Sequence, residues 1–236
     1  MGSVLLDICL FGCAAAILVL PVRYALRYLL RKKDTDRTNN MAIAIAFAAG
    51  AVDGKLCDEE ISAIKKWAQK NMPNSNNRKF HRSITKTAEF FLTGNNIDIE
   101  GMCQELVLTA KSAARYDAIQ LAMETIAADG IATVSEMEFI KKLALRLEID
   151  SNKFRSMLEA IVPVNIHQNK DLNLLFGIDE ETNDNNLTAK LNTEYRKWNS
   201  RITNSDEKIS EQAHLMIELI TQAKKKLMTN QISVEQ

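Results

Sequence analysis

The sequence predicts an all-α protein. Gly and Pro, which break helices and mark turns, number only 8 and 3 among 236 residues. Hydrophobic residues make up 46% of the chain and charged residues 25%, so most of it can bury a core. Apolar residues also recur at helical spacing through long stretches with few breaks. These observations predict an anchor over 1–37, a helical bundle over 38–163, a helical hairpin over 171–228 and a tail over 229–236.

Charge and cysteine usage exclude several classes of protein. Lys plus Arg and Asp plus Glu number 30 each, so the formal net charge is zero and lacks the basic excess of a nucleic-acid binder. The cysteines form no C-x-x-C pair and the histidines are scattered, which argues against a zinc site. The chain also lacks the phosphate-binding glycine loops and nucleophile motifs of common enzymes. We therefore expect neither an enzyme nor a resident cofactor.

The N-terminal segment is typical of a transmembrane helix. Val4 to Val22 is apolar apart from Asp7, and a helix of this length rises about 28 Å, close to the ~30 Å hydrocarbon core of a bilayer. A basic flank follows it and none precedes it. By the positive-inside rule, this predicts an uncleaved single-pass anchor in a bacterial inner membrane, with the N-terminus outside and the domains cytoplasmic.

The basic flank predicts a helix that continues along the lipid surface. Its cations can meet anionic headgroups, each contributing roughly 1 kcal/mol near the surface. These membrane-interface residues are Arg23, Arg27, Arg31, Lys32 and Lys33. Gly12 and Ala16 form a small-xxx-small pair that could support a homodimer, although small residues are common in such helices without one.

The middle of the chain predicts a bundle of helices. Asp34 to Asn40 is polar and is expected to be a short linker, whereas Ala42 to Ala51 is apolar nearly all round, as in a central helix. Amphipathic stretches then cover 58–72, 77–93, 99–113, 115–128, 134–147 and 151–162.

Two places in this bundle look alike. Asp53-Gly54 is followed by Glu60, and Asp129-Gly130 by Glu136, so both read D-G-x5-E before a second helix. The glycine can adopt the left-handed conformation that ends a helix, and the aspartate can accept hydrogen bonds from turn amides. In the second copy, Thr133 or Ser135 can cap the next helix, with Glu136 or Glu138 closing a capping box.

The acidic residues of the two copies allow two interpretations. They can form one shared acidic site across a pseudo-twofold axis, or each can serve only its own turn and cap. The spacing also matches half of an EF-hand loop, but Ala49, Ala51 and Ala127 stand at three of the four preceding ligand positions. A true EF-hand is therefore excluded, and the turn-and-cap interpretation explains each acidic residue.

The two copies resemble the TerB-like domain over residues 38–163. They read AGAVDGKLCDEEISAIKKWA and AADGIATVSEMEFIKKLALRLEID. This all-helical family occurs in tellurite-resistance proteins and in DjlA-type membrane co-chaperones. The resemblance implies a role for the acidic turns in binding a divalent metal, with Asp53, Glu60, Asp129 and Glu136 as the matching residues.

The C-terminal part predicts two antiparallel helices. Asn165 to Asp171 is polar and reads as a linker, and Leu174 to Ile178 can pack across the open end of a hairpin. Helical patterns then run over 187–201 and 207–227, with Trp198 at an apolar position of the first. This plan is similar to a J domain over 171–228.

A working J domain carries His-Pro-Asp in its loop, and this chain does not. The matching positions are Thr203, Asn204 and Ser205, counted from Tyr195-Arg196-Lys197. The order of anchor, TerB-like domain and J-like tail nevertheless resembles that of DjlA-type proteins. The resemblance therefore implies the same architecture with a changed function.

Three functions follow as expectations. The first is a membrane-anchored cytoplasmic scaffold or adaptor that binds components of a membrane complex. The second is a co-chaperone that engages a DnaK-type chaperone through other residues. The third is a metal-responsive protein of tellurite or envelope stress, with the acidic turns as ligands.

Overall fold

The computed structural model describes residues 35–72, 78–93, 97–168 and 184–234, which are helical apart from short connections and one isolated β-bridge. The predicted all-α class is confirmed for these residues. None of their helices is both long and apolar enough to cross a membrane. The predicted anchor, its basic flank and the Gly12–Ala16 pair lie outside the described residues.

The bundle begins with a helix over 35–50 that ends in the 3-10 turn η1 (Ala51–Asp53). The helices that follow are α2 (Asp58–Asn71), α3 (Arg78–Leu92), α4 (Ile99–Thr109), α5 (Ser112–Ile126), α6 (Val134–Arg146) and α7 (Ser151–Ile161). Their bounds lie close to the predicted stretches, except between α4 and α5. There the chain turns at Ala110 and Lys111, which are extended, about four residues before the predicted break.

The core of the bundle forms around the two helices that precede the Asp-Gly turns. The helix over 35–50 and α5 are apolar on most faces, and both bury large side chains such as Phe47 and Met123 completely. Phe47 also stacks on Phe91 of α3, with ring centroids 6.1 Å apart. Burying side chains on all sides fixes these helices in the centre.

The expected linker over Asp34 to Asn40 is wrong for the described residues, because 35–40 are already helical. The segment has no Gly or Pro to stop a helix. It is also held by its neighbours: Arg37 pairs with Glu105 of α4 at 2.6 Å, and the Asn39 amide donates to the carbonyl of Asn71 at 3.2 Å.

The C-terminal hairpin consists of α9 (Asp184–Asn199) and α10 (Glu207–Val234), which pack along each other. Its own apolar cluster includes Trp198, Leu191 and Ile220, all buried. The predicted packing of Leu174 to Ile178 across the hairpin falls outside the described residues. Val164, in the short turn η2 (Val164–Ile166), instead contributes to this cluster from the bundle side.

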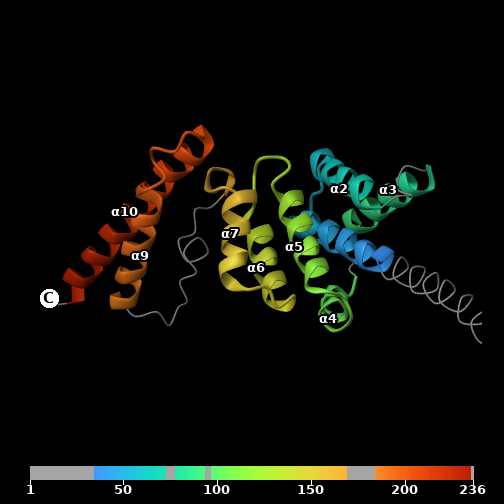
Figure 1. The fold of residues 1–236 in the computed structure, drawn as a ribbon, viewed down its shortest axis with the longest axis horizontal. Coiled ribbons are helices and arrows are strands. Elements are labelled where there is room, and N and C mark those ends of the chain that lie inside the picture. Colours follow the sequence, from blue (N-terminus) through green and yellow to red (C-terminus); the bar gives the residue numbers. More distant parts are fainter. Residues whose placement is uncertain (1–34, 73–77, 94–96, 169–183, 235–236) are drawn as a thin grey trace, which may run out of the picture.

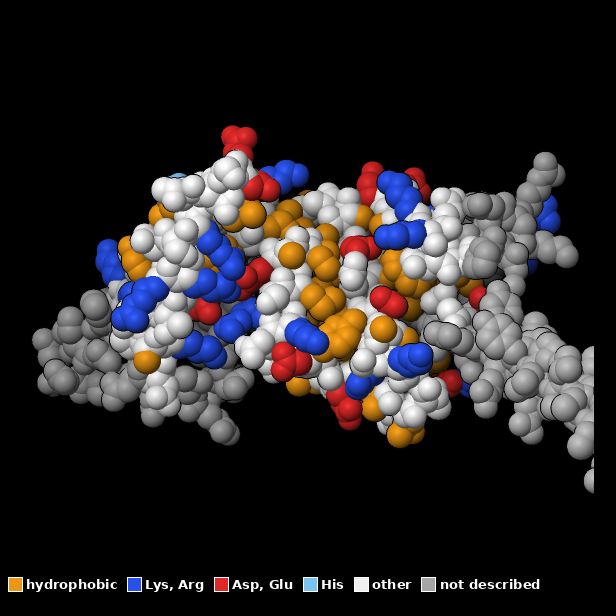
Figure 2. All heavy atoms as spheres, in the orientation of Figure 1, with side chains coloured by type: hydrophobic (Ala, Val, Ile, Leu, Met, Phe, Trp, Pro, Cys, Tyr) orange, Lys and Arg blue, Asp and Glu red, His pale blue; other side chains and the backbone are white. Residues whose placement is uncertain are grey.

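The elements are arranged in a row (Figure 1). The hairpin lies at one end beside α7, the helices α5 and α6 lie in the middle, and α2 and α3 lie towards the other end. On the face shown in Figure 2, basic side chains gather over the hairpin, while apolar side chains show between charged ones over the bundle.

Candidate functional site

The two Asp-Gly turns have the same local structure. Gly54 and Gly130 both have φ of 83°, the left-handed conformation that glycine adopts at little cost. In each turn the aspartate Oδ1 accepts a hydrogen bond at 2.9 Å from the backbone N–H two residues further on. The predicted repeat of helix, Asp-Gly turn and helix is therefore present in the structure.

Both second helices begin with a capping box. In α6, the Glu136 carboxylate accepts from the backbone N–H of Thr133 at 2.7 Å and from its hydroxyl at 2.8 Å. The N–H of Glu136 donates back to the Thr133 hydroxyl at 3.3 Å. Of the two predicted pairs for this cap, the structure selects Thr133 with Glu136 and not Ser135 with Glu138.

The cap of α2 was not predicted. Cys57 takes the place of Thr133: its N–H donates to Glu60 at 2.7 Å, and its Sγ accepts from the Glu60 N–H at 3.4 Å. Sulfur is a weak acceptor and cysteine is not a preferred capping residue, so the sequence carries little signal for it. Burial raises the pKa of the Cys57 thiol to about 12, which keeps it protonated.

The two capping glutamates come together in the interior. Glu60 is 5% exposed and Glu136 is 4% exposed, which is rare for carboxyl groups. Burial, together with the charges of Glu60 and Asp53, raises the pKa of Glu136 to about 7. Burial likewise raises the pKa of Glu60, assisted by the charge of Asp129. Each glutamate is thus under the influence of the acidic turn of the other copy.

Gly50 makes room for this pair. A Cβ at Gly50 would lie 2.8 Å from Oε1 of Glu60 and 2.9 Å from the Leu56 side chain. Such distances are shorter than real contacts allow, so the backbone of the first helix approaches the carboxyl group closely. The matching position in the second copy holds Ile126, so this feature belongs to the first copy alone.

Both interpretations of the acidic residues find support. Acidic residues of the two copies influence each other's pKa, as a shared site requires. Each glutamate also accepts the hydrogen bonds of its own helix cap. Among the described residues, no group of three or more His, Cys, Asp or Glu side chains is placed to hold a metal ion. Metal binding by Asp53, Glu60, Asp129 and Glu136 stays a prediction of the resemblance.

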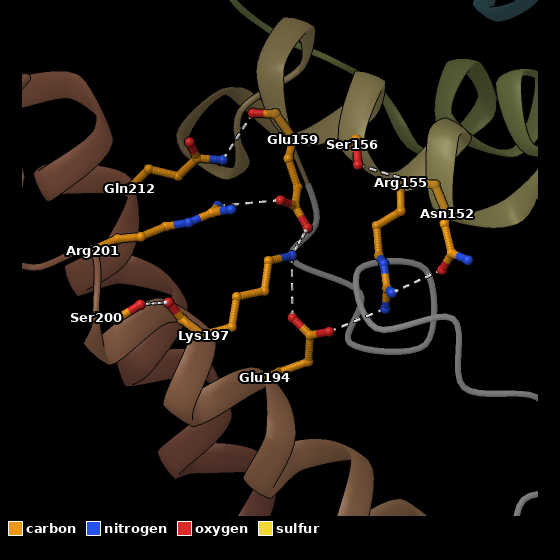
Figure 3. Close-up of polar contacts among 9 residues, drawn as sticks. All are labelled: Asn152, Arg155, Ser156, Glu159, Glu194, Lys197, Ser200, Arg201 and Gln212. Atoms are coloured by element: carbon orange, nitrogen blue, oxygen red, sulfur yellow. Dashed lines mark hydrogen bonds and ion pairs between the residues drawn. The ribbon is translucent and has the colours of Figure 1, made fainter.

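The hairpin is docked on α7 through Glu159 (Figure 3). The Glu159 carboxylate forms ion pairs with Lys197 and, at 3.3 Å, with Arg201. Lys197 lies in the last turn of α9, and Arg201 follows just after this helix. The backbone carbonyl of Glu159 accepts from the Gln212 amide of α10 at 3.1 Å. One residue of α7 therefore contacts both arms of the hairpin.

A second ion pair extends the junction, the contact between α7 and the hairpin, along α9. Arg155 of α7 lies 3.0 Å from the buried Glu194, which also lies 3.6 Å from Lys197. Lys197 and Arg201 in turn lie over the ring of Trp198, at 5.1 and 4.7 Å from its centroid. Because these charged groups are only partly exposed, their pairing is screened less than that of a surface ion pair.

Residues 164–168, the connecting segment, fasten the hairpin to the second acidic turn. The N–H of Ala132 donates to the carbonyl of Ile166 at 2.8 Å, and the N–H of Gln168 donates to the carbonyl of Ala132 at 2.8 Å. His167 is buried and its Nε2 donates to the carbonyl of Val162 at 2.9 Å; burial lowers its pKa, so it is neutral.

The predicted polar linker over Asn165 to Asp171 is therefore wrong over its described part. Val164 packs in the hairpin cluster and Ile166 packs against the bundle, from different sides of the short 3-10 turn η2. In the sequence, the only sign that this segment is packed was that the apolar Val164 and Ile166 flank a polar residue.

The loop of the hairpin is exposed. Thr203, Asn204 and Ser205, which match the J tripeptide, lie between α9 and α10 and face solvent. Asn204 lines a groove together with Glu159 of α7 and Ile209 of α10. The junction thus holds the helices of the hairpin and leaves its tip open.

No protein-family model, curated protein or solved structure matches this chain.

Proposed function

We propose that the chain is a membrane-anchored adaptor that presents its C-terminal hairpin, in a fixed orientation, to a partner protein in the cytoplasm. The bundle serves as the support and the exposed loop around Thr203 as part of the binding surface. The N-terminal segment holds this assembly at the inner face of a bacterial membrane.

The observation that carries this proposal is the way the hairpin is held. Glu159 contacts both of its helices, and the connecting segment bonds it to the second turn, while the loop stays open to solvent. A rigid support with an exposed tip suits binding, because a pre-oriented surface loses less conformational entropy when a partner docks.

Two features of the loop support an adaptor over a co-chaperone. The tripeptide His-Pro-Asp is replaced by Thr203, Asn204 and Ser205, which offer neither the imidazole nor the rigid proline. Lys197, in the last turn of α9, and Arg201, just after this helix, are both paired with Glu159. We expect no stimulation of a DnaK-type ATPase by this chain.

The test is affinity purification of the full-length protein from membranes, with mass spectrometry of the co-purified proteins. Thr203→Arg places a long cation at the exposed tip of the hairpin. Gln69→Arg, on an exposed position of α2, adds the same charge elsewhere and serves as the matched control. We expect a defined set of partners with the wild type and the control, and loss of at least one of them with Thr203→Arg.

Two results would contradict the proposal. If all three proteins recover the same partners, the tip of the hairpin does not bind them. If a DnaK-type chaperone leads the set and its ATPase is stimulated by the purified protein, the chain is a co-chaperone.

A further inference from the structure

The described chain begins at one particular end of the bundle. Arg37, near the start of the first helix, pairs with Glu105 of α4 at 2.6 Å. Thr35 and Arg37 also line the same hollow as Thr109 and Lys111, where α4 passes into α5. The segment that precedes residue 35 therefore emerges beside this corner, which we name the α4 corner.

The two most exposed large apolar side chains of the described residues lie on α4 and beside its start. Leu108, near the C-terminus of α4, is 82% exposed, and Leu145, near the C-terminus of α6, is 74% exposed. The neighbour of Leu145, Arg146, pairs with Glu100 of α4 at 2.6 Å, which brings the end of α6 to α4. Figure 1 shows α4 and the adjoining end of α6 along one edge of the molecule.

The length of chain before residue 35 places this corner close to the lipid, an argument that rests on the proposed anchor. Lys33, the last residue of the basic flank, precedes Thr35 by two residues, which span at most about 7 Å. The headgroup layer on each side of a bilayer is itself about 5–8 Å thick. A flank lying among headgroups therefore holds Thr35 at their outer boundary.

We infer that the α4 corner rests on the inner surface of the membrane and that Leu108 inserts among the lipid headgroups. Insertion removes an apolar side chain from water, as in interfacial helices. Two acidic groups near this corner are neutralised by ion pairs, Glu105 with Arg37 and Glu100 with Arg146, and burial raises the pKa of the third, Asp117. Lys111 is exposed beside Leu108 and can meet an anionic headgroup.

The experiment measures the depth of a tryptophan in the full-length protein, reconstituted in vesicles of phosphatidylethanolamine and phosphatidylglycerol. Leu108→Trp is compared with Val52→Trp, which is 39% exposed and follows the far end of the first helix, about 24 Å from its start. The signal of the native Trp67 and Trp198 is subtracted with the wild type. Brominated lipids then quench any tryptophan within the bilayer surface.

We expect quenching of Leu108→Trp to be at least about twice that of Val52→Trp, and that of Leu145→Trp to fall between them. Equal quenching at positions 108 and 52, in protein that floats with the vesicles, overturns this inference and leaves the anchor standing. A co-purifying protein lost with Leu108→Ser would then assign the leucine to a protein interface. Protein that fails to float overturns the anchor itself, and the inference with it.

Discussion

The two Asp-Gly turns have the same structure but different attachments. Both have a left-handed glycine, an aspartate that bonds the turn, and a buried glutamate that closes a capping box. They differ two residues after the glycine. Ala132 of the second turn carries the connecting segment on both its N–H and its carbonyl. Leu56 of the first turn makes no hydrogen bond within the part of the chain that the structure describes.

This difference separates the residues that form the turn from the residues that determine its contacts. Residues shared by the two copies define the turn and its cap, so the same fold arises twice. Residues that differ determine what contacts each turn. In the first copy, Gly50 lets the backbone of the first helix approach Glu60 closely. In the second copy, Ala132 bonds the connecting segment, residues 164–168, which contacts the hairpin. Substitutions in the two turns test this division.

The buried pair should make stability depend on pH, and Glu136→Gln should reduce that dependence. Burial raises the pKa of Glu136 from 4.5 to about 7, so the protonated form is favoured in the folded state. Its contribution is therefore fully present below pH 4.5 and is lost as pH rises through about 7. The largest contribution that this pKa shift can make to the free energy of unfolding is about 3 kcal/mol.

Urea unfolding of wild type and Glu136→Gln from pH 4.5 to 8 measures this. His167 acts in the opposite sense, because burial lowers its pKa from 6.5, so its contribution is lost as pH falls. It is present in both proteins and cancels in their difference. Glu138→Gln, an exposed neighbour on α6, should keep the wild-type profile. A Glu136→Gln profile as steep as that of the wild type would contradict the account of the pair.

The glycines of the two turns should lose the same free energy of unfolding when they are replaced by alanine. A Cβ at Gly54 or Gly130 would meet no atom within 4 Å, so alanine costs only the left-handed conformation at φ of 83°. We expect Gly54→Ala and Gly130→Ala each to lower the free energy of unfolding by about 1–2 kcal/mol. Thermal unfolding measures both. Costs that differ by more than about 1 kcal/mol would mean that the turns are not equivalent.

The caps should differ. Thr133 donates to Glu136 through its hydroxyl and accepts from its N–H, whereas the Cys57 sulfur is a weak acceptor at 3.4 Å and its thiol a weak donor to Glu60. We expect Thr133→Ala to cost about 1 kcal/mol and Cys57→Ala only a few tenths. Chemical denaturation of the two variants side by side tests this, and equal costs would remove the distinction between the caps.

The smallest effect should be a gain. Cys57→Thr gives the first copy the cap of the second, and we expect it to raise the free energy of unfolding by about 0.5 kcal/mol. Because Cys57 is half-buried beside Glu60, Cys57→Ser serves as the control that supplies a hydroxyl without the extra methyl group. A loss of stability in both variants would show that sulfur is preferred at this position.

Local patterns in the sequence predicted most of the fold and part of the site. Helix periodicity predicted the positions of α2 to α7. The D-G-x5-E spacing predicted both turns, and the sequence offered Thr133 as one of two possible caps for α6. These features depend on residues within a few positions of one another. The hairpin of α9 and α10 was predicted for the same reason.

Features that depend on distant contacts were missed. The bridge between Ala132 and His167 joins residues that are far apart in sequence, and no local pattern marks a segment as docked rather than loose. The polar residues at 34–40 and 165–168 read as linkers because their partners, such as Glu105 and Ala132, lie elsewhere in the chain. The repeat left open whether the acidic turns meet, and it did not predict that their glutamates are buried.

The most direct test of the central claim is residue-resolved hydrogen exchange on the full-length protein, comparing the amides of Ala132 and Gln168 with that of Leu56. We expect the first two amides to be protected together, because each donates to a backbone carbonyl across the bridge, and the Leu56 amide to exchange much faster. Glu159→Gln, which weakens the docking of the hairpin, should reduce the protection of Gln168 and leave Leu56 unchanged. Exchange at Ala132 as fast as at Leu56 would show that the second turn does not hold the hairpin.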